Sequence, residues 1–153
     1  MTPMQPQDSW ASGDAYEPYV GRWSRLVARP FLAWLALPPG GQWLDVGCGT
    51  GALSATILHH AAPSLVKGID RSAEYSAFAQ ARIHDARAQF GVGDAQALPV
   101  ESGSYDAVVS GLMLNFVVQP GQAMAEMARA AKAGGMVAAY VWDYAAKMQL
   151  MRH

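Results

Sequence analysis

Short apolar runs alternate along this chain with amphipathic stretches. The amphipathic stretches carry apolar residues at helical spacing and predict helices over 52–61, 72–84 and 120–131. The apolar runs have the length of buried strands and predict strands over 42–46, 65–69, 89–92, 105–110 and 136–142. Strands that alternate with helices favour parallel pairing through right-handed crossovers. The pattern therefore predicts an α/β fold with a doubly wound parallel sheet.

Helical spacing also runs from Pro18 to Leu37, ahead of the first predicted strand. Pro30 removes a backbone donor and disfavours helix at Arg29, so we expect two short helices here. A turn at 38–41, with the sequence PPGG, ends this region. The apolar positions of the two helices are Trp23, Leu26, Val27, Phe31, Trp34 and Leu35.

The three later helices have predicted inner faces. Ser72 is a favourable N-cap for the second of them, with Glu74 in its first turn. The residues expected to pack inward are Leu53, Ile57, Leu58, Tyr75, Phe78, Ala79, Ile83, Met124 and Met127. Met113 and Met136 are expected in the core as well.

A glycine-rich run follows the first predicted strand, where residues 44–51 read LDVGCGTG. Gly47, Gly49 and Ala52 match the G-x-G-x-x-G/A pattern, and Asp70 lies at about the expected distance beyond it. Glycine permits a tight turn and lets a ligand approach bare backbone. The run predicts a site for an adenosine-type cofactor, and the alternative is a plain turn between strand and helix.

Asp45, two residues before the first glycine, discriminates among such cofactors. Its charge would repel a pyrophosphate, which nicotinamide and flavin cofactors carry. It would attract an ammonium or sulfonium group, and S-adenosylmethionine carries both and no phosphate. We therefore expect S-adenosylmethionine, with an NAD(P)-dependent oxidoreductase as a less favoured alternative.

From about residue 16 to residue 142, the chain resembles the class I S-adenosylmethionine-dependent methyltransferases. Within them it is similar to the small-molecule "type 11" group that includes the ubiquinone/menaquinone-type enzymes. The first motif, D-x-G-x-G-x-G, is matched in full by 45–51. The other motifs match at Gly68-Ile69-Asp70, Gly93-Asp94-Ala95 with Leu98-Pro99, 105–110 (YDAVVS) and Gly134-Gly135.

This resemblance implies a Rossmann-like sheet of strand order 3-2-1-4-5 with helices on both faces. The cofactor crevice would lie beside strands one and four, where the order reverses. We expect a flexible N-terminal arm over 1–15 and a cofactor-binding domain over 16–153. Such domains continue past strand five to a helix and a final antiparallel pair of strands, six and seven, and we expect these two strands to be absent here. Strand five would then be an exposed edge, through which a homodimer could form.

Candidate roles follow for the residues at the crevice. Asp70 would accept hydrogen bonds from both ribose hydroxyls, and its alternative is an acid that caps the following helix. Asp94 would accept from the adenine amino group while the Ala95 amide donates to the ring; its alternative is a turn residue. Arg71 is a further cofactor-binding candidate beside Asp70.

The other candidates concern the amino-acid part of the cofactor. Asp45 would lie near its ammonium group, which the Ser110 carbonyl would also face. Arg22 would bind its carboxylate through a bidentate pair, or else is a solvated surface arginine. The remaining cofactor-binding candidates act through backbone and lack of bulk: Gly47, Cys48, Gly49 and Gly51.

Methyl transfer is an in-line displacement that needs closeness and a dry pocket more than a charged catalyst. We therefore name no catalytic residue. Residues 110–116 (SGLMLNF) lack the Asn/Asp-Pro-Pro-Tyr motif of related enzymes that methylate bases or glutamine, which favours a small, partly apolar acceptor. Cys48 has no base beside it and is interpreted as a packing residue. No metal-ligand spacing occurs.

Composition excludes few of the possible functions. The 153 residues include 11 basic and 12 acidic ones, so the chain has no basic field for nucleic acid. One cysteine fits a reducing, cytoplasmic setting. No apolar run reaches the length of a membrane span. A non-catalytic module that keeps the fold remains an alternative to an enzyme.

Overall fold

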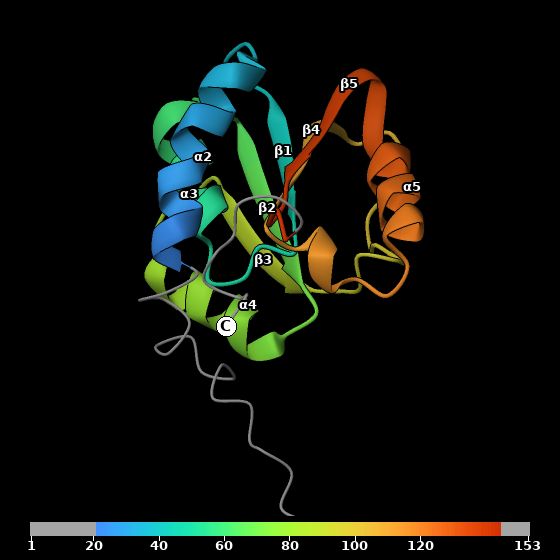
Figure 1. Ribbon diagram of the computed structural model, residues 1–153. Helices are drawn as coiled ribbons and strands as arrows, with labels where there is room; N and C mark the ends of the chain where they lie inside the picture. The colour runs from blue at the N-terminus through green and yellow to red at the C-terminus, as the bar shows by residue number, and fades with distance from the viewer. Residues whose placement is uncertain (1–20, 145–153) are drawn as a thin grey trace, which may run out of the picture.

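The computed structural model describes residues 21–144 of the 153-residue chain, which form a parallel sheet with helices on both faces (Figure 1). The strand order is β3-β2-β1-β4-β5, and all four pairs of neighbouring strands are parallel. The strands are β1 (Gln42–Val46), β2 (Leu65–Asp70), β3 (Ala88–Val92), β4 (Tyr105–Gly111) and β5 (Ala131–Tyr140). The predicted α/β class and the strand order 3-2-1-4-5 are confirmed.

Helices α2, α3 and α4 lie on one face of the sheet, and α5 lies on the other (Figure 1). Their bounds are α2 (Arg22–Leu35), α3 (Ala52–His60), α4 (Ala73–Arg82) and α5 (Pro120–Ala130), with a 3-10 turn η2 (Leu114–Phe116). The predicted cap of α4 is confirmed, because the Ser72 hydroxyl accepts a hydrogen bond from the Tyr75 amide at 3.3 Å.

The core has two parts because successive side chains of a strand point to opposite faces. On the side of α2 and α3, Trp43 of β1 and Val109 of β4 pack with helix residues that include Phe31 and Ile57. On the side of α5, Leu44 and Val46 of β1 pack with Met127. The central strand β1 is thus covered on both faces.

The expectation of two short helices broken at Pro30 is wrong, because α2 runs unbroken from Arg22 to Leu35. Pro30 lies on the exposed side of this helix. The carbonyl that loses its partner there belongs to Leu26, which is also exposed, so water can satisfy it. An exposed proline is therefore tolerated inside this helix.

Only part of the apolar pattern of α2 is buried. Phe31 and Leu35 lie in the core as expected. The other apolar positions are exposed: Trp23 at 54%, Leu26 at 57%, Val27 at 38% and Trp34 at 75%. Together with Pro30 they form the apolar flank of α2, which covers none of the described core.

Two predictions at the end of the chain need correction. β5 begins at Ala131 rather than Met136, because Ala131 already pairs with Tyr105 before a shift in register. Met124 and Met136 are exposed, whereas Met127 is fully buried and Met113 is half-buried. On α5, the buried stripe falls on Ala123, Met127 and Ala130, and Met124 lies beside it.

The expected arm over 1–15 lies outside the described residues. Between residues 21 and 144, no helix has the length and apolar character needed to cross a membrane.

Candidate functional site

The glycine-rich loop lies where β1 ends, next to the carboxyl end of β2. Gly47, Gly49 and Gly51 have φ values of +72°, +53° and +91°, which favour glycine. The Gly47 and Cys48 amides both donate to the Ile69 carbonyl, at 2.7 and 3.1 Å. Backbone hydrogen bonds therefore fix the start of this loop against β2.

Two of these glycines also lack room for a side chain. A Cβ at Gly47 would come within 2.7 Å of the Met113 Cβ. A Cβ at Gly51 would come within 2.6 Å of the Ile83 Cδ1 atom. Met113 belongs to the segment after β4, so that segment closes directly over the loop. The sequence pattern gave Met113 only as a core residue.

Asp70, at the end of β2, ties the glycine-rich loop to the next helix. One carboxylate oxygen accepts from the Gly49 amide at 2.9 Å, and the other accepts from the Ser72 amide at 2.8 Å. The capping alternative from the sequence is thus present in the structure. An ionised carboxylate has about four acceptor sites, so Asp70 keeps capacity for two further donors.

Asp45 is a buried carboxyl group with unused hydrogen-bonding capacity. Its side chain is 1% exposed; Oδ2 accepts from the Ser54 hydroxyl at 2.7 Å, and Oδ1 has no hydrogen-bond partner. Burial raises the pKa of Asp45 to about 7, with Asp70 adding to the rise and Ser54 opposing it. A buried oxygen without a partner is costly, so a ligand that donates a hydrogen bond here would be favoured.

Ser110 is also fully buried, and its hydroxyl lacks a partner. It does not share a face with Asp45. Asp45 is in register with Val109, and the next residue along β4 points to the opposite side of the sheet. The two unpartnered groups are therefore separate features of the same sheet end.

Asp94 and Ala95 lie in the turn that follows β3. Asp94 is exposed, and its Oδ1 accepts from the Gln96 amide at 2.8 Å. The Gly93 amide donates to the Asp70 carbonyl at 3.0 Å, which joins this turn to the end of β2. Arg71, immediately after β2, is exposed.

Arg22 is the exposed first residue of α2. The N-terminal turn of α2 lies at the carboxyl end of the sheet, because the Ser24 hydroxyl is 3.2 Å from the Tyr140 hydroxyl at the end of β5. All eleven residues named as cofactor candidates therefore belong to segments at this end of the sheet.

Cys48 is buried, and burial raises the pKa of its thiol well above the ordinary value. The thiol thus stays neutral, in keeping with a packing role. Within residues 21–144, no three His, Cys, Asp or Glu side chains form a group that could hold a metal ion.

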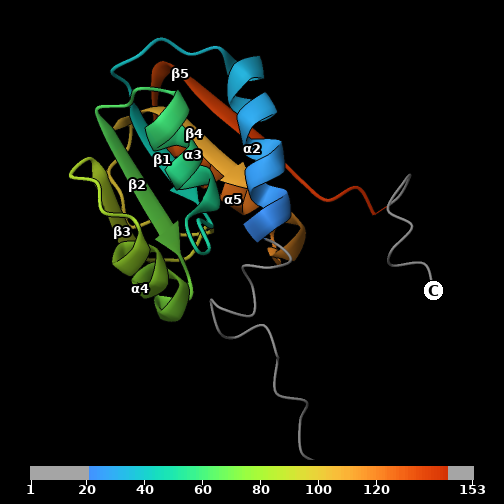
Figure 2. The same ribbon diagram turned by 90° about the vertical axis from the view of Figure 1, so that its left-hand side faces the viewer.

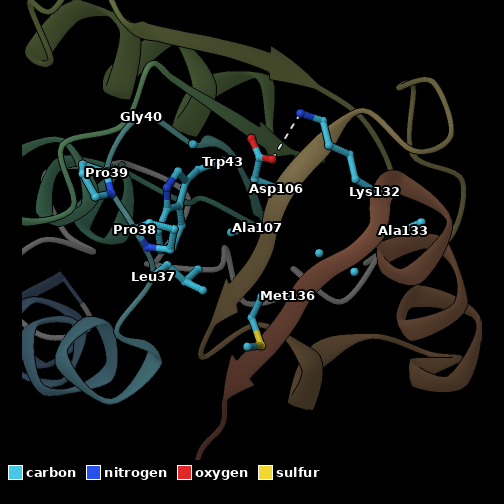
Figure 3. A pocket seen from close by; sticks show the side chains of 13 residues that line it. Leu37, Pro38, Pro39, Gly40, Trp43, Asp106, Ala107, Lys132, Ala133 and Met136 are labelled. Atoms are coloured by element: carbon cyan, nitrogen blue, oxygen red, sulfur yellow. Dashed lines mark hydrogen bonds and ion pairs between the residues drawn. The ribbon is translucent and has the colours of Figure 1, made fainter.

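A cavity of about 380 Å³ lies at the opposite, amino end of the sheet (Figure 3). Prolines 38 and 39, Trp43 and Met136 form part of its wall. The Lys132 ammonium group lies 3.1 Å from Asp106 Oδ1 at its rim, as the dashed line in Figure 3 marks. None of the eleven cofactor-binding candidates lines this cavity, although the motif glycines Gly134 and Gly135 do.

Sequence reasoning missed the side chains that support the site. Ser54 bonds to Asp45, and Tyr140 bonds to Ser24. Ser54 follows Asp45 by nine positions and comes three positions after Gly51, so its closeness to the glycine-rich run was a usable signal. Ser24 and Tyr140 lie 116 positions apart, and no local pattern connects them.

The fold and the loop together define a Rossmann-like α/β domain with a glycine-rich turn at its topological switch point. Residues 44–139 match the family described as "Methyltransferase domain". The chain belongs to this family of S-adenosylmethionine-dependent methyltransferases, and the resemblance expected from its motifs is confirmed.

Individual relatives agree with this assignment. The demethylmenaquinone methyltransferase of Roseiflexus castenholzii is 37% identical over 105 residues, which are 68% of this chain and 44% of that protein. This chain therefore spans less than half the length of that relative.

Two solved structures have a similar fold. A protein solved in complex with the Haloferax volcanii Trm112 methyltransferase activator superposes with a TM-score of 0.77 at 27% identity, covering 88% of this chain and 59% of that one. The [4+2]-cyclase SpnF superposes with a TM-score of 0.63 at 30% identity, covering 86% of this chain and 48% of that one.

Proposed function

We propose that residues 16–153 form a domain that binds S-adenosylmethionine and transfers its methyl group to a small-molecule acceptor. S-adenosylhomocysteine would be the product. One observation carries the proposal beyond family membership: the buried Asp45 oxygen that has no partner, next to a glycine-rich loop.

The donor properties of this cofactor fit that observation. Its ammonium group is a cationic hydrogen-bond donor. Asp45 Oδ1 could accept a hydrogen bond from it, because this oxygen has no other partner. A pyrophosphate in the same position would face a buried carboxyl group. Burial raises the pKa of Asp45 to about 7, and a cation bound beside it would lower that pKa and favour the ionised carboxylate. These points support the methyl donor over a dinucleotide.

The other candidates have distinct binding roles. Asp70 would accept from the ribose hydroxyls while it holds the loop through Gly49. Asp94 and the Ala95 amide would contact adenine. The Ser110 carbonyl would face the ammonium group, and Arg22 would bind the carboxylate.

The cofactor supplies an electrophilic methyl group, and the chain has to hold an acceptor in line with it and exclude water. Met113, packed over Gly47, is an apolar wall of this kind. Phe116, exposed at 62%, and Val118, exposed at 86%, follow Met113 along the chain and favour a partly apolar acceptor.

Calorimetry with S-adenosylmethionine, S-adenosylhomocysteine and NAD tests the cofactor. We expect both sulfur ligands to bind and NAD not to bind. Binding of NAD alone would refute the proposal. A radiolabelled methyl donor offered with quinones, phenols and amines then tests the acceptor class.

The similarity to SpnF favours one alternative, because its name states a cyclase and not a methyltransferase. A domain of this fold can thus serve a purpose other than methyl transfer. In that case the methyl donor would bind, yet no acceptor would be methylated. The hypothesis of a non-catalytic module would then replace that of a methyltransferase.

A second copy of the chain is our proposed partner at the outer edge of β5, with which no strand of residues 21–144 pairs. The segment from Met136 to Trp142 has neither charge nor proline to block pairing with another strand. Two β5 edges paired antiparallel would bring the apolar flanks of both α2 helices to the same seam. Light scattering should report a dimer, and Trp34→Glu should shift it to monomer. A wild-type monomer at 100 µM, on the order of a weak interface's Kd, would refute this pairing.

A further inference from the structure

Tyr140, the last residue of β5, fastens the first turn of α2 to the sheet. Its hydroxyl lies 3.2 Å from the hydroxyl of Ser24, which is 8% exposed. Its ring meets Phe31 edge to face, with centroids 4.9 Å apart and an interplanar angle of 66°. Tyr140 thus contacts α2 at two positions seven residues apart, and Figure 2 shows α2 beside β5.

The space for this ring comes from Gly111, the residue of β4 in register with Tyr140. A Cβ at Gly111 would come within 2.6 Å of the Tyr140 Cζ atom and closer still to its hydroxyl. The phenol therefore lies directly on the backbone of β4. Any side chain at position 111 would displace the ring and break its contact with Ser24.

Tyr140 lies on the same face of the sheet as Asp45, at the end where the cofactor candidates lie. Asp45, Val109 and Ala138 form one row across β1, β4 and β5. Tyr140 is two residues beyond Ala138, so it points to the same face as Asp45. Burial raises the pKa of Tyr140 to about 12, so at neutral pH its hydroxyl keeps its proton.

Asp70 and Tyr140 lie at the carboxyl ends of two strands that are not neighbours, β2 and β5. β1 and β4 separate their strands, and three steps between strands span about 14 Å. β1 ends one residue before Gly47, which Met113 covers, and β4 ends at Gly111, which the Tyr140 ring covers. With the ribose at Asp70, the amino-acid part of the cofactor would extend toward Tyr140.

The orientation of α2 places its arginines on the side of the glycine-rich loop. Arg22, Arg25 and Arg29 recur at a spacing that puts them on one flank of the helix. Arg29 lines a cavity with His60 at the end of α3, so this flank faces α3. The first residue of α3 directly follows Gly51.

We propose that Tyr140 is a positioning residue for the cofactor. Through its hydrogen bond with Ser24, Tyr140 fixes the first turn of α2 and so holds Arg22 near the amino-acid part of the cofactor. This inference rests on the proposed function, because it presumes that the cofactor occupies the crevice. It gives Tyr140 and Ser24 a joint role that neither motif nor family membership assigns.

The test compares two ligands that differ only in the part that Arg22 would hold. S-adenosylhomocysteine has the amino-acid group, and 5′-methylthioadenosine lacks it. Tyr140→Phe keeps the ring over Gly111 and its contact with Phe31. We expect it to weaken S-adenosylhomocysteine about tenfold, the loss of one hydrogen bond, and to leave 5′-methylthioadenosine within about twofold.

Two further variants complete the experiment. Ser24→Ala should reproduce the selective loss, and combining it with Tyr140→Phe should cost no more than either change alone, because both remove the same bond. Tyr105→Phe, a buried tyrosine at the opposite end of β4, is the matched control and should leave both affinities unchanged.

Three other results would contradict this role of Tyr140, and they can be told apart. If both ligands weaken equally in Tyr140→Phe and Ser24→Ala, the contact is merely structural. If S-adenosylhomocysteine binds these variants as tightly as wild type, Tyr140 does not position anything. If neither ligand binds the wild-type chain, the proposed function itself is wrong.

Discussion

The two ends of the parallel sheet differ in whether their acidic side chains have hydrogen-bonding capacity that the protein itself does not use. At the carboxyl end, Asp45 has a buried oxygen without a partner, next to a loop in which three glycines have positive φ. At the amino end, Asp106 and Lys132 border a cavity, but they pair with each other. Their side chains are 46% and 44% exposed, so water also serves them.

This difference shows why volume alone is a poor guide to the site. The amino-end cavity is about 380 Å³, large enough for a small molecule, yet it contributes no unsatisfied buried side-chain group. The spare hydrogen-bonding capacity of the carboxyl end lies in the desolvated acid Asp45, because the Gly47 and Gly49 amides already donate to Ile69 and Asp70. Predictions that separate the two ends therefore test the site assignment directly.

The largest effect should come from removing the charge of Asp45. Because folding raises its pKa from 3.8 to about 7, the folded state binds this proton more tightly than the unfolded state between those values. The free energy of unfolding should therefore fall as pH rises from 4 to 8, by about 4 kcal/mol for a shift of this size. Asp45→Asn should remove that fall, as urea unfolding at each pH would report.

Asp106→Asn at the amino end is the control. Gln42 and Lys132 lower the pKa of Asp106, so its contribution is lost only as the pH falls below the ordinary range of a carboxyl group. This variant should keep the wild-type slope above pH 5. An unchanged slope in Asp45→Asn would show that Asp45 is ionised in the unliganded protein.

Asp70→Ala should have the next largest effect, on cofactor binding. It removes an acceptor for two ribose hydroxyls and frees the Gly49 amide. Loss of about 3 kcal/mol corresponds to more than 100-fold weaker binding of S-adenosylhomocysteine in calorimetry.

Asp106→Ala should leave this affinity within about twofold, since its carboxylate lies at the other end of the sheet. Unchanged affinity in Asp70→Ala would remove the ribose assignment and leave only the observed role of Asp70 as a link between loop and helix.

Most of the architecture could be predicted because its signals are local. The strand at 42–46 and the cap at Ser72 depend on neighbouring residues, and both were confirmed. The broken helix at Pro30 was wrong because the cost of a proline depends on which side of the helix meets water, a tertiary property.

The chemistry of the site was only partly accessible from the sequence. The motifs brought Asp45, Asp70 and the glycines to one sheet end, as expected for parallel strands. Helical spacing alone could not tell that Trp34 would be exposed and Phe31 buried, because both fit an amphipathic helix. The bond between Ser24 and Tyr140 depends on the folded packing of α2 on β5.

Alanine substitutions at two glycines with similar φ angles compare how crowded the two ends of the sheet are. Gly51 has φ +91° and faces Ile83 and Ala79, whereas Gly134 has φ +77° with no atom within 4 Å of an added Cβ. Alanine at either position carries backbone strain of about 1–2 kcal/mol. Gly51→Ala should cost about 1 kcal/mol more than Gly134→Ala in thermal or urea unfolding, because Ile83 must also move. Equal costs would mean that the surroundings of Gly51 adjust to a side chain as easily as the open start of β5 does.

The smallest effect should follow from Lys132→Ala. Its ion pair with Asp106 is half-exposed, and such pairs contribute about 0.2–1 kcal/mol. Asp106 would still accept from the Gln42 amide at 2.7 Å, so no acceptor is left without a donor. We expect a change below about 0.5 kcal/mol in unfolding and an unchanged affinity for S-adenosylhomocysteine. A tenfold loss of that affinity would show that the amino-end cavity is coupled to the loop, and the two ends could no longer be treated as independent.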